Sequence, residues 1–214
     1  MILLTSLYKS EVRNHEFKLC IEKNCQLDIV KKYIIFFEGY STEIKDSIEF
    51  QYLKDPKIKI IPIVSRPSYK TFIDFSNNHF NNEIVCVLNA DVYFDDTINK
   101  ITNVNLENTF FCITRIHTSL KIHQNPGSQD AWIFKTPLKN FENDIKMGVL
   151  GCDSYIAQKA RESGLVVKNP CLSINLFHVH NKGDPNSKSH TFLNGKCYWA
   201  EKDYKSLEIP YSEF

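Results

Sequence analysis

Residues 83–91, which read EIVCVLNAD, decide the fold of this chain. The run EIVCVL is apolar at nearly every position, as in a strand that is covered on both faces of a sheet. Asn89, Ala90 and Asp91 follow it directly, so polar side chains stand where the strand ends. Ligands of open α/β sheets bind outside the carboxyl ends of the strands. The segment therefore predicts a central strand with a binding edge after it.

Outward from this segment, strand and helix patterns alternate, which favours a mostly parallel sheet flanked by helices. The second half of the chain holds more strand than helix, so we expect a mixed sheet. We predict the α/β class and one domain over residues 1–214. The expected strands are 2–8, 32–37, 58–64, 83–88, 110–115 and 131–135, with strand material at 166–167 and 172–178, and the expected helices are 16–24, 47–53, 69–77 and 154–163.

The composition narrows the partners and the compartment. The 214 residues carry a net charge of +1, without the basic surplus that nucleic-acid binding uses. Residues 1–14 contain a short apolar run with neither a preceding basic segment nor a cleavage site, so they predict no signal peptide and no membrane span. Seven cysteines without a CxxC pair favour buried thiols in a reducing compartment. We expect a cytoplasmic protein or a domain of a larger one, and the oligomeric state stays open.

Asp91 is the first candidate for chemistry. A carboxylate at a strand exit can bind a hard divalent cation, and Asn89 can hydrogen-bond a sugar or ribose. A cation is needed there because one carboxylate would repel a diphosphate. Asn and Asp are also common in turns that end strands, so the motif alone leaves both interpretations open.

The segment GVLGCD, residues 148–153, is the second candidate. Its glycines allow the backbone to approach a ligand closely. Asp153 stands at the start of a predicted helix, where Asp is a preferred N-cap. It can also act as a base for an acceptor hydroxyl, and both roles are compatible.

The segment LFHVHNKG, residues 176–183, places His178 and His180 at alternate positions of a strand. Alternate residues of a strand point to the same face. Imidazole suits Mn²⁺ and similar ions, so one of the two histidines is expected to complete a metal site.

Three further positions lie beside predicted strand ends. Asp130 in SQDAWIF, residues 128–134, can hydrogen-bond sugar hydroxyls, whereas Trp132 is expected in the core. Arg66 follows the third predicted strand, where it can pair with a phosphate or hold a base, although a surface arginine is the usual case. Tyr8 ends the first predicted strand and can stack on a base.

The order of these motifs resembles glycosyltransferases of the GT-A fold, over nearly the whole chain. NAD at 89–91 resembles the DxD metal motif, GVLGCD the loop and acid, and HVHNKG, residues 178–183, the late histidine. The chain also resembles the compact, anchor-free glycosyltransferase domain of large chlorella-infecting viruses, which would place it in the host cytoplasm. The resemblance implies a nucleotide-binding half over about 1–100 and an acceptor and catalytic half over about 101–214. It further implies a base pocket lined by Ser6, Leu7 and Tyr8 with Arg66 nearby, a motif at Asn89, Ala90 and Asp91, and metal binding by Asp91 with His178 or His180.

The resemblance implies a metal-dependent transferase of the EC 2.4 class. It would use Mn²⁺ or Mg²⁺ and a nucleotide-sugar donor, here a UDP-sugar, with a glycan or glycoprotein hydroxyl as acceptor. Asp130 and Asp153 would orient donor and acceptor, and Asp153 would be the base if the reaction inverts configuration. Asn89 departs from the motif and removes one charge.

Two other functions stay open, and a third is disfavoured. Asn89 is the best support for a binding module of this fold that has lost turnover. A metal-dependent phosphohydrolase would need more acids, and Asp95 and Asp96, the nearest ones, are expected to begin a helix. A nicotinamide dehydrogenase is disfavoured because no GxGxxG follows the first strand.

Overall fold

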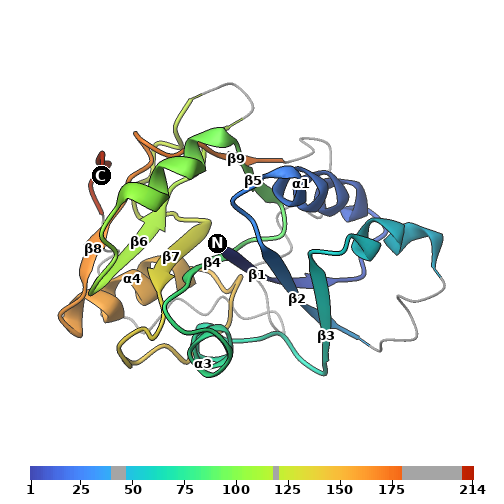
Figure 1. Cartoon of the computed structure of the whole chain (residues 1–214), viewed down its shortest axis with the longest axis horizontal. Coiled ribbons are helices and arrows are strands. Elements are labelled where there is room, and N and C mark those ends of the chain that lie inside the picture. Colours follow the sequence, from blue (N-terminus) through green and yellow to red (C-terminus); the bar gives the residue numbers. More distant parts are fainter. Residues whose placement is uncertain (40–46, 118–120, 180–208) are drawn as a thin grey trace.

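A seven-stranded sheet with the strand order β3-β2-β1-β4-β7-β6-β8 forms the centre of the molecule (Figure 1). The computed structural model describes residues 1–39, 47–117, 121–179 and 209–214. The strands of this sheet are β1 (Ile2–Tyr8), β2 (Lys32–Glu38), β3 (Ile58–Ile63), β4 (Ile84–Leu88), β6 (Thr109–Ile113), β7 (Ala131–Lys135) and β8 (Val166–Lys168). The helices are α1 (Asn14–Gln26), α3 (Tyr69–His79) and α4 (Cys152–Glu162), with 3₁₀ segments η1 (Ile48–Lys54) and η2 (Asp96–Asn103).

The sheet is mixed but mostly parallel, as the alternation of elements predicts. β3, β2, β1 and β4 are parallel neighbours, and β8 is parallel to β6. β7 alone runs against its neighbours β4 and β6. The start of β7 therefore lies at the same edge of the sheet as the ends of β4 and β6.

The alternation of side chains along the strands fills two cores, one on each face of the sheet. One core joins the sheet to α1, η1 and η2 and includes Leu3 of β1 and Phe17 of α1. The other joins it to α3 and α4 and includes Leu4 of β1 and Phe72 of α3. Figure 1 shows the sheet between these two layers. Successive residues of β1 thus face opposite cores, which is the period of two that a doubly covered strand requires.

A short second sheet lies beyond the carboxyl end of β4. It pairs β5 (Val92–Phe94) with β9 (Leu176–His178) in antiparallel fashion, so that Val92 faces His178. Sequence patterns do not predict β5, since three residues are too short to show a period. The strand expected at 172–178 covers only 176–178, because residues 171–174 form turns and bends in which backbone N–H groups of 173 and 174 bond to Pro170.

Two predicted helices differ from the structure in their details. The segment expected as a helix at 47–53 is the 3₁₀ segment η1, which Ser47 caps by accepting from the N–H of Glu49. α4 begins at Cys152, earlier than the expected 154, because Gly151 is the N-cap in a left-handed conformation with φ of 81°. Asp153 is therefore inside the first turn of α4, so of the two roles that the sequence leaves open for it, the N-cap role falls to Gly151 instead.

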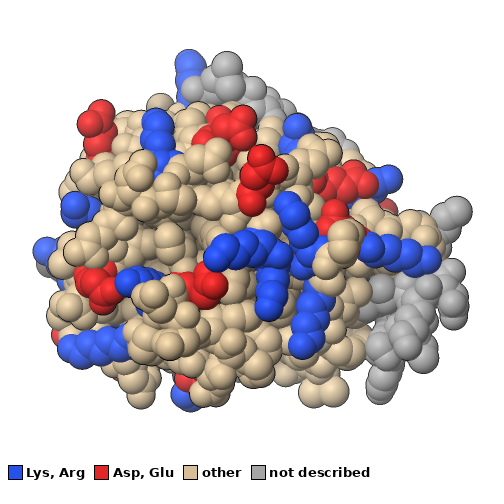
Figure 2. Space-filling view, viewed as in Figure 1, with Lys and Arg blue, Asp and Glu red and all other residues tan. Residues whose placement is uncertain are grey.

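Charged side chains of both signs are scattered over the viewed face of the molecule, most of which is formed by other residues (Figure 2). Figure 2 shows Lys and Arg side chains gathered near the middle of this face, with Asp and Glu side chains around them. In the described part of the chain no helix has the length and apolar character that a membrane crossing needs. The six cysteines of this part are buried and free, as predicted, and Trp132 is buried in the core.

Candidate active site

The carboxyl ends of β4 and β6 and the start of β7 form one rim, and backbone hydrogen bonds fix their register there. The N–H of Asn89 donates to the carbonyl of Asp130 at 2.9 Å, and the N–H of Asp130 donates to Ile113 at 3.0 Å. Asn89 and Asp130, far apart in sequence, are thereby side by side. The rim that the segment 83–91 predicts exists, and it gathers the candidate residues of three strands.

Asp91 and His178 meet at this rim. The His178 Nε2 atom lies 3.2 Å from Asp91 Oδ2, and the two side chains are 14–15% exposed. The antiparallel pairing of β5 and β9 brings them together, and the N–H of Val179 donates to the carbonyl of Asp91 at 2.9 Å. Burial works against the ionised carboxylate, but the hydrogen bond and charge of His178, together with Arg13, hold the pKa of Asp91 below its usual range. Burial lowers the pKa of His178, and Asp91 outweighs this effect and raises it.

Arg13 approaches the same carboxylate from the start of α1. Its Nη2 donates to Asp91 Oδ2, and its Nε donates to Glu16 Oε2 at 2.8 Å. Glu16 is only 2% exposed, so the Arg13 guanidinium compensates two negative charges, that of the buried Glu16 and that of Asp91. The Cζ atom of Arg13 also lies over the ring of Phe17, 5.0 Å from the centroid. Burial opposes the charge of Arg13, yet its acidic partners raise its pKa.

The chemistry of these side chains fits a divalent cation bound together with a diphosphate. Asp91 offers a carboxylate oxygen and His178 an imidazole nitrogen, both partly exposed. The described residues contain no group of three or more His, Cys, Asp and Glu side chains that could hold a metal. A cation here would therefore draw its other ligands from outside that set, as phosphate oxygens of a donor can provide. It would also have to share Asp91 with Arg13.

Asp130 is held at the rim by two donors. Asn89 Nδ2 donates to its Oδ1 at 2.9 Å, and Arg115 Nη1 donates to its Oδ2 at 2.8 Å. The Asp130 side chain is 6% exposed. Its position is thus fixed by an amide that follows β4 and a guanidinium that follows β6.

Asp153 reaches the rim from the first turn of α4. Its Oδ2 accepts from the N–H of Gln129 at 3.2 Å, and its Oδ1 accepts from the N–H of Ser154 at 3.1 Å. Burial, and then the charge of Asp130, raise the pKa of Asp153 to about 6. A carboxyl group with a pKa near neutrality can accept a proton during catalysis.

A second polar group lies at the ends of β1, β2 and β3. Ser6 Oγ donates to Glu38 Oε1 at 3.0 Å, and Arg66 Nε lies 3.4 Å from the same oxygen. The Arg66 guanidinium lies 5.8 Å from the centroid of the Tyr8 ring. Gly148 approaches Arg66 closely, since a Cβ at Gly148 would lie 3.4 Å from Arg66 Nη1. This links the glycine loop to the predicted base pocket.

The structure brings most of the predicted site residues to this edge. Leu7 is there only through its backbone, because its side chain is fully buried in the core, and Ala90 is 8% exposed. His180 lies outside the described residues. Sequence reasoning missed Arg13, Glu38 and Arg115, whose partners Asp91, Arg66 and Asp130 are 78, 28 and 15 positions away. Glu38 follows a predicted strand and Arg115 ends one, so both positions carry a sequence signal, whereas Arg13 carries none.

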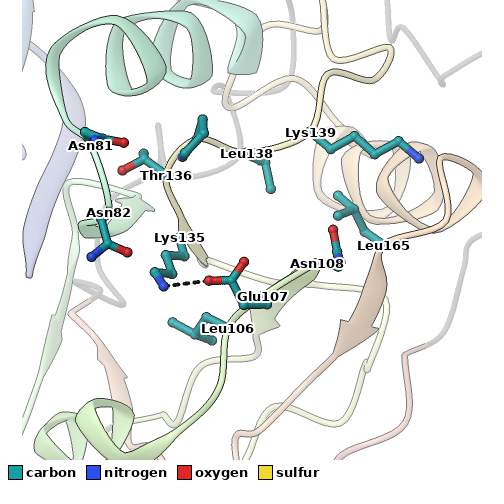
Figure 3. A pocket seen from close by; sticks show the side chains of 11 residues that line it. Asn81, Asn82, Leu106, Glu107, Asn108, Lys135, Thr136, Leu138, Lys139 and Leu165 are labelled. Carbon is teal, nitrogen blue, oxygen red and sulfur yellow. Dashed lines mark hydrogen bonds and ion pairs between the residues drawn. The ribbon is translucent and has the colours of Figure 1, made fainter.

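A separate pocket lies at the opposite edge of the sheet (Figure 3). It has a volume of about 150 Å³ and is lined by residues before β4 and β6 and after β7. Lys135 Nζ and Glu107 Oε1 face each other there at 2.6 Å, and Lys139 Nζ donates to the carbonyl of Ser163. None of the predicted site residues lines it, so this pocket is not the candidate active site.

Comparison with solved structures gives the fold a reference, whereas no protein-family model and no curated protein matches the chain. The mannosyltransferase PcManGT from Pyrobaculum calidifontis, in complex with GDP-Man and Mn²⁺, has a TM-score of 0.56 at 14% identity over 87% of this chain and 59% of that chain. TarS 1–349 from S. aureus, in complex with UDP-GlcNAc, has a TM-score of 0.49 at 11% identity over 85% and 56%. The chain thus spans less than two thirds of these proteins. The mixed, mostly parallel sheet and the first likeness confirm the predicted GT-A fold.

Proposed function

We propose that this chain is a metal-dependent glycosyltransferase of the EC 2.4 class. It would move a hexosyl or pentosyl group from a UDP-sugar to a hydroxyl of a glycan or glycoprotein. The observation that carries the proposal is the meeting of Asp91 and His178, 3.2 Å apart, at the rim of a GT-A sheet that also holds Asp130 and Asp153. A cytoplasmic site of action and kinship with virus-encoded domains stay predictions from the sequence.

The donor would bind across the ends of β1 to β4. Ser6, Tyr8 and the backbone of Leu7 would line the base, and Arg66 would stack on it or pair with a phosphate. Glu38 has a 21% exposed side chain beside Ser6 and Arg66, so its carboxylate can accept an N–H of the base. These residues lie in the half of the chain over about 1–100 that the proposal assigns to nucleotide binding.

Asp91 and His178 would hold Mn²⁺ or Mg²⁺ beside the donor diphosphate, with His180 as the alternative histidine. When bound, the ion would supply positive charge that stabilises the departing nucleotide. Arg13 places a second positive charge at Asp91. Asn89 and Ala90 would belong to the same donor-binding segment as Asp91. Asn89 would hold Asp130 in place through the hydrogen bond between them.

Asp153 would serve as the base in an inverting transfer. A carboxylate oxygen of Asp153 would take the proton of the acceptor hydroxyl. The hydroxyl oxygen of the acceptor would at the same time form a bond to the anomeric carbon of the donor sugar. The bond between the anomeric carbon and the diphosphate oxygen breaks, and its electron pair leaves with UDP. Asp130, fixed by Asn89 and Arg115, would hold hydroxyl groups of the donor sugar.

Two alternatives make different predictions. A binding module that has lost turnover would bind UDP-sugars without transferring them to any acceptor, and the missing first acid at Asn89 is its support. A phosphohydrolase would release phosphate from a simple phosphomonoester. Asp95, which that reading needs, caps η2 by accepting from the N–H of Thr97 at 3.0 Å and also accepts from Asn175.

The direct test measures thermal unfolding with a panel of nucleotide sugars, with and without Mn²⁺. A ligand that binds only the folded state raises the unfolding temperature. We expect a UDP-sugar to raise it more in the presence of Mn²⁺, and Asp91→Asn to abolish this difference. Asp28→Asn, which removes an exposed carboxylate after α1, is the matched control and should keep the difference. An equal metal-dependent shift in Asp91→Asn would refute the metal assignment.

Transfer itself separates the enzyme from a binding module. Nucleotide sugars that give a shift should be incubated with glycan acceptors, and release of UDP should be measured. We expect release to depend on the acceptor and on Asp153. Binding without release for all acceptors tested would favour the module.

A further inference from the structure

Two carboxyl groups of the rim, Asp130 and Asp153, have very different surroundings. Asp130 accepts from an amide and a guanidinium. Asp153 accepts from two backbone N–H groups and has no cation within salt-bridge distance among the described residues. Neighbouring acids whose environments differ in this way can take different roles in one reaction.

Arg115 is the cation that makes the difference. Its Nη1 donates to Asp130 Oδ2 at 2.8 Å and to Ser128 Oγ at 3.2 Å, and its side chain is 18% exposed. Arg115 follows β6 by two residues, where the chain leaves the sheet at the rim. Burial opposes its charge, but Asp130, Asp91 and Asp153 raise the pKa of Arg115.

The other side of the guanidinium faces a neutral group. His123 Nε2 lies 3.4 Å from Arg115 Nη2, and His123 Nδ1 lies 2.8 Å from His117 Nε2. Burial, and then the charge of Arg115, lower the pKa of His123 to about 4. His123 is therefore uncharged near neutrality, so it adds no second positive charge beside Arg115.

We propose that Arg115 is a positioning residue that fixes Asp130 and partly offsets the charge of Asp130 at Asp153, so that the Asp153 carboxyl stays ionised and can accept a proton at neutral pH. The effect of Arg115 on Asp130 and Asp153 depends only on contacts within the folded chain. The effect of Arg115 on sugar transfer rests on the proposed function. Asn89 completes the arrangement, because its amide occupies the remaining oxygen of Asp130 where a carboxylate would repel it.

The groups around Asp153 leave Arg115 as the charge that can be varied. Asp130, which precedes β7, and Arg115, which follows β6, are the charged groups that act on Asp153. The other titratable neighbours are thiol or phenol groups whose pKa values burial raises, so they stay neutral where Asp153 titrates; they are Tyr69 of α3, Cys112 of β6 and Cys152 of α4.

The experiment titrates the carboxyl carbons of ¹³C-aspartate-labelled protein by NMR, without donor or metal. The spectrum of Asp153→Asn assigns the Asp153 resonance. In Arg115→Gln we expect the pKa of Asp153 to rise by about half a unit to one unit, less than the 1–3 units that a charge in direct contact causes. Arg115→Lys should restore part of the wild-type value because it keeps the charge without the planar guanidinium that reaches both Asp130 and Ser128.

A matched control and a second variant keep the test decisive. Arg161→Gln removes an exposed cation of α4, the helix that carries Asp153, and should leave the titration unchanged. If Arg115→Gln does not fold, Asp130→Asn tests the same coupling from the other side and should lower the pKa of Asp153. An unchanged Asp153 titration in folded Arg115→Gln, or in Asp130→Asn, would overturn the proposal.

The titration and the enzyme assay test two separate hypotheses, so that either one can be refuted without the other. If Asp153 shifts as expected but no donor or acceptor supports transfer, the effect of Arg115 on Asp153 stands and the proposed function falls. If transfer occurs, its dependence on pH should have the Asp153 midpoint and should move upward in Arg115→Gln. A transferase whose midpoint does not move in that variant would show that Arg115 has no part in setting the base.

Discussion

Asn89 is the residue at which the metal motif departs from two acids, and its contacts give the physical reason. Its Nδ2 donates to Asp130 at 2.9 Å, so an acid at position 89 would face another carboxylate. We expect Asn89→Asp to lower the free energy of unfolding by about 2 kcal/mol at neutral pH, because a hydrogen bond becomes a repulsion. Chemical denaturation measures this change.

Asn105→Asp is the control variant, because it adds the same negative charge at an exposed position. Asn105 is exposed, and its Oδ1 accepts from the N–H of Glu107 at 2.9 Å, which an aspartate can do equally well. It should therefore change stability by less than about 0.5 kcal/mol. Equal effects of the two variants would show that the contact between Asn89 and Asp130 contributes nothing.

Asp153 makes folding stability depend on pH. Its pKa is about 6 in the folded protein, against an ordinary value of 3.8. The folded state thus binds the proton more tightly than the unfolded state, and this contribution is complete below pH 4 and is lost as pH rises through 6. The loss amounts to about 3 kcal/mol at most, from roughly 1.4 kcal/mol per pKa unit.

Asp153→Asn removes this titration, so the pH series needs both proteins. We expect the stability of the variant minus that of the wild type to increase between pH 4 and pH 7 and then to level off. Denaturation midpoints at a series of pH values measure it. A constant difference over that range would contradict the raised pKa.

At the scale of elements, the ribbon of β5 and β9 positions the metal candidates, and α1 holds the ribbon. Asn24 of α1 is fully buried; its Nδ2 donates to the carbonyl of Val92, and its Oδ1 accepts from the N–H of Phe94, both at 3.0 Å. One amide thus satisfies two backbone groups of β5.

Asn24→Ala should lower the free energy of unfolding by about 2–4 kcal/mol, since it leaves a buried donor and a buried acceptor without partners. It should also reduce the Mn²⁺-dependent thermal shift, because β5 follows Asp91 directly. Gln26→Ala removes an exposed amide from the same helix and serves as the control. Similar denaturation curves for the two variants would rule out the role of Asn24.

The ribbon also marks the limit of what sequence patterns can predict. Apolar runs in the sequence predict long strands such as β1, β2 and β4, and these strands agree with their predicted ranges within one residue. β5 has three residues, and its pairing with β9 depends on a partner more than 80 positions away, which no local period records. Asp91 and His178 were each predicted from their places at strand ends. Arg115 also ends a predicted strand, whereas Arg13, whose partner Asp91 is 78 positions away, left no local pattern.

At the scale of the whole molecule, the two ends of the sheet strands differ in the charged groups that they hold. The edge at the ends of β4 and β6 holds buried charges that contact one another, whereas the opposite edge holds the pocket with Lys135 and Glu107 (Figure 3). Lys135 and Glu107 are 30% and 63% exposed, and pairs of this kind contribute about 0–1 kcal/mol. The charges of Lys135 and Glu107 are therefore expected to contribute little to stability.

This division can be tested with one pair of variants on the two edges. Glu107→Gln should change the unfolding free energy by less than about 1 kcal/mol and should leave the shift caused by a UDP-sugar with Mn²⁺ unchanged. Asp130→Asn, which alters a 6% exposed carboxylate of the other edge, should reduce that shift, because the donor sugar is expected to contact Asp130. Thermal unfolding of both proteins with the same ligands measures the contrast. A loss of the ligand-induced shift in Glu107→Gln alone would move the donor site to the pocket side of the sheet, since the binding energy would then depend on a residue that the rim does not contact.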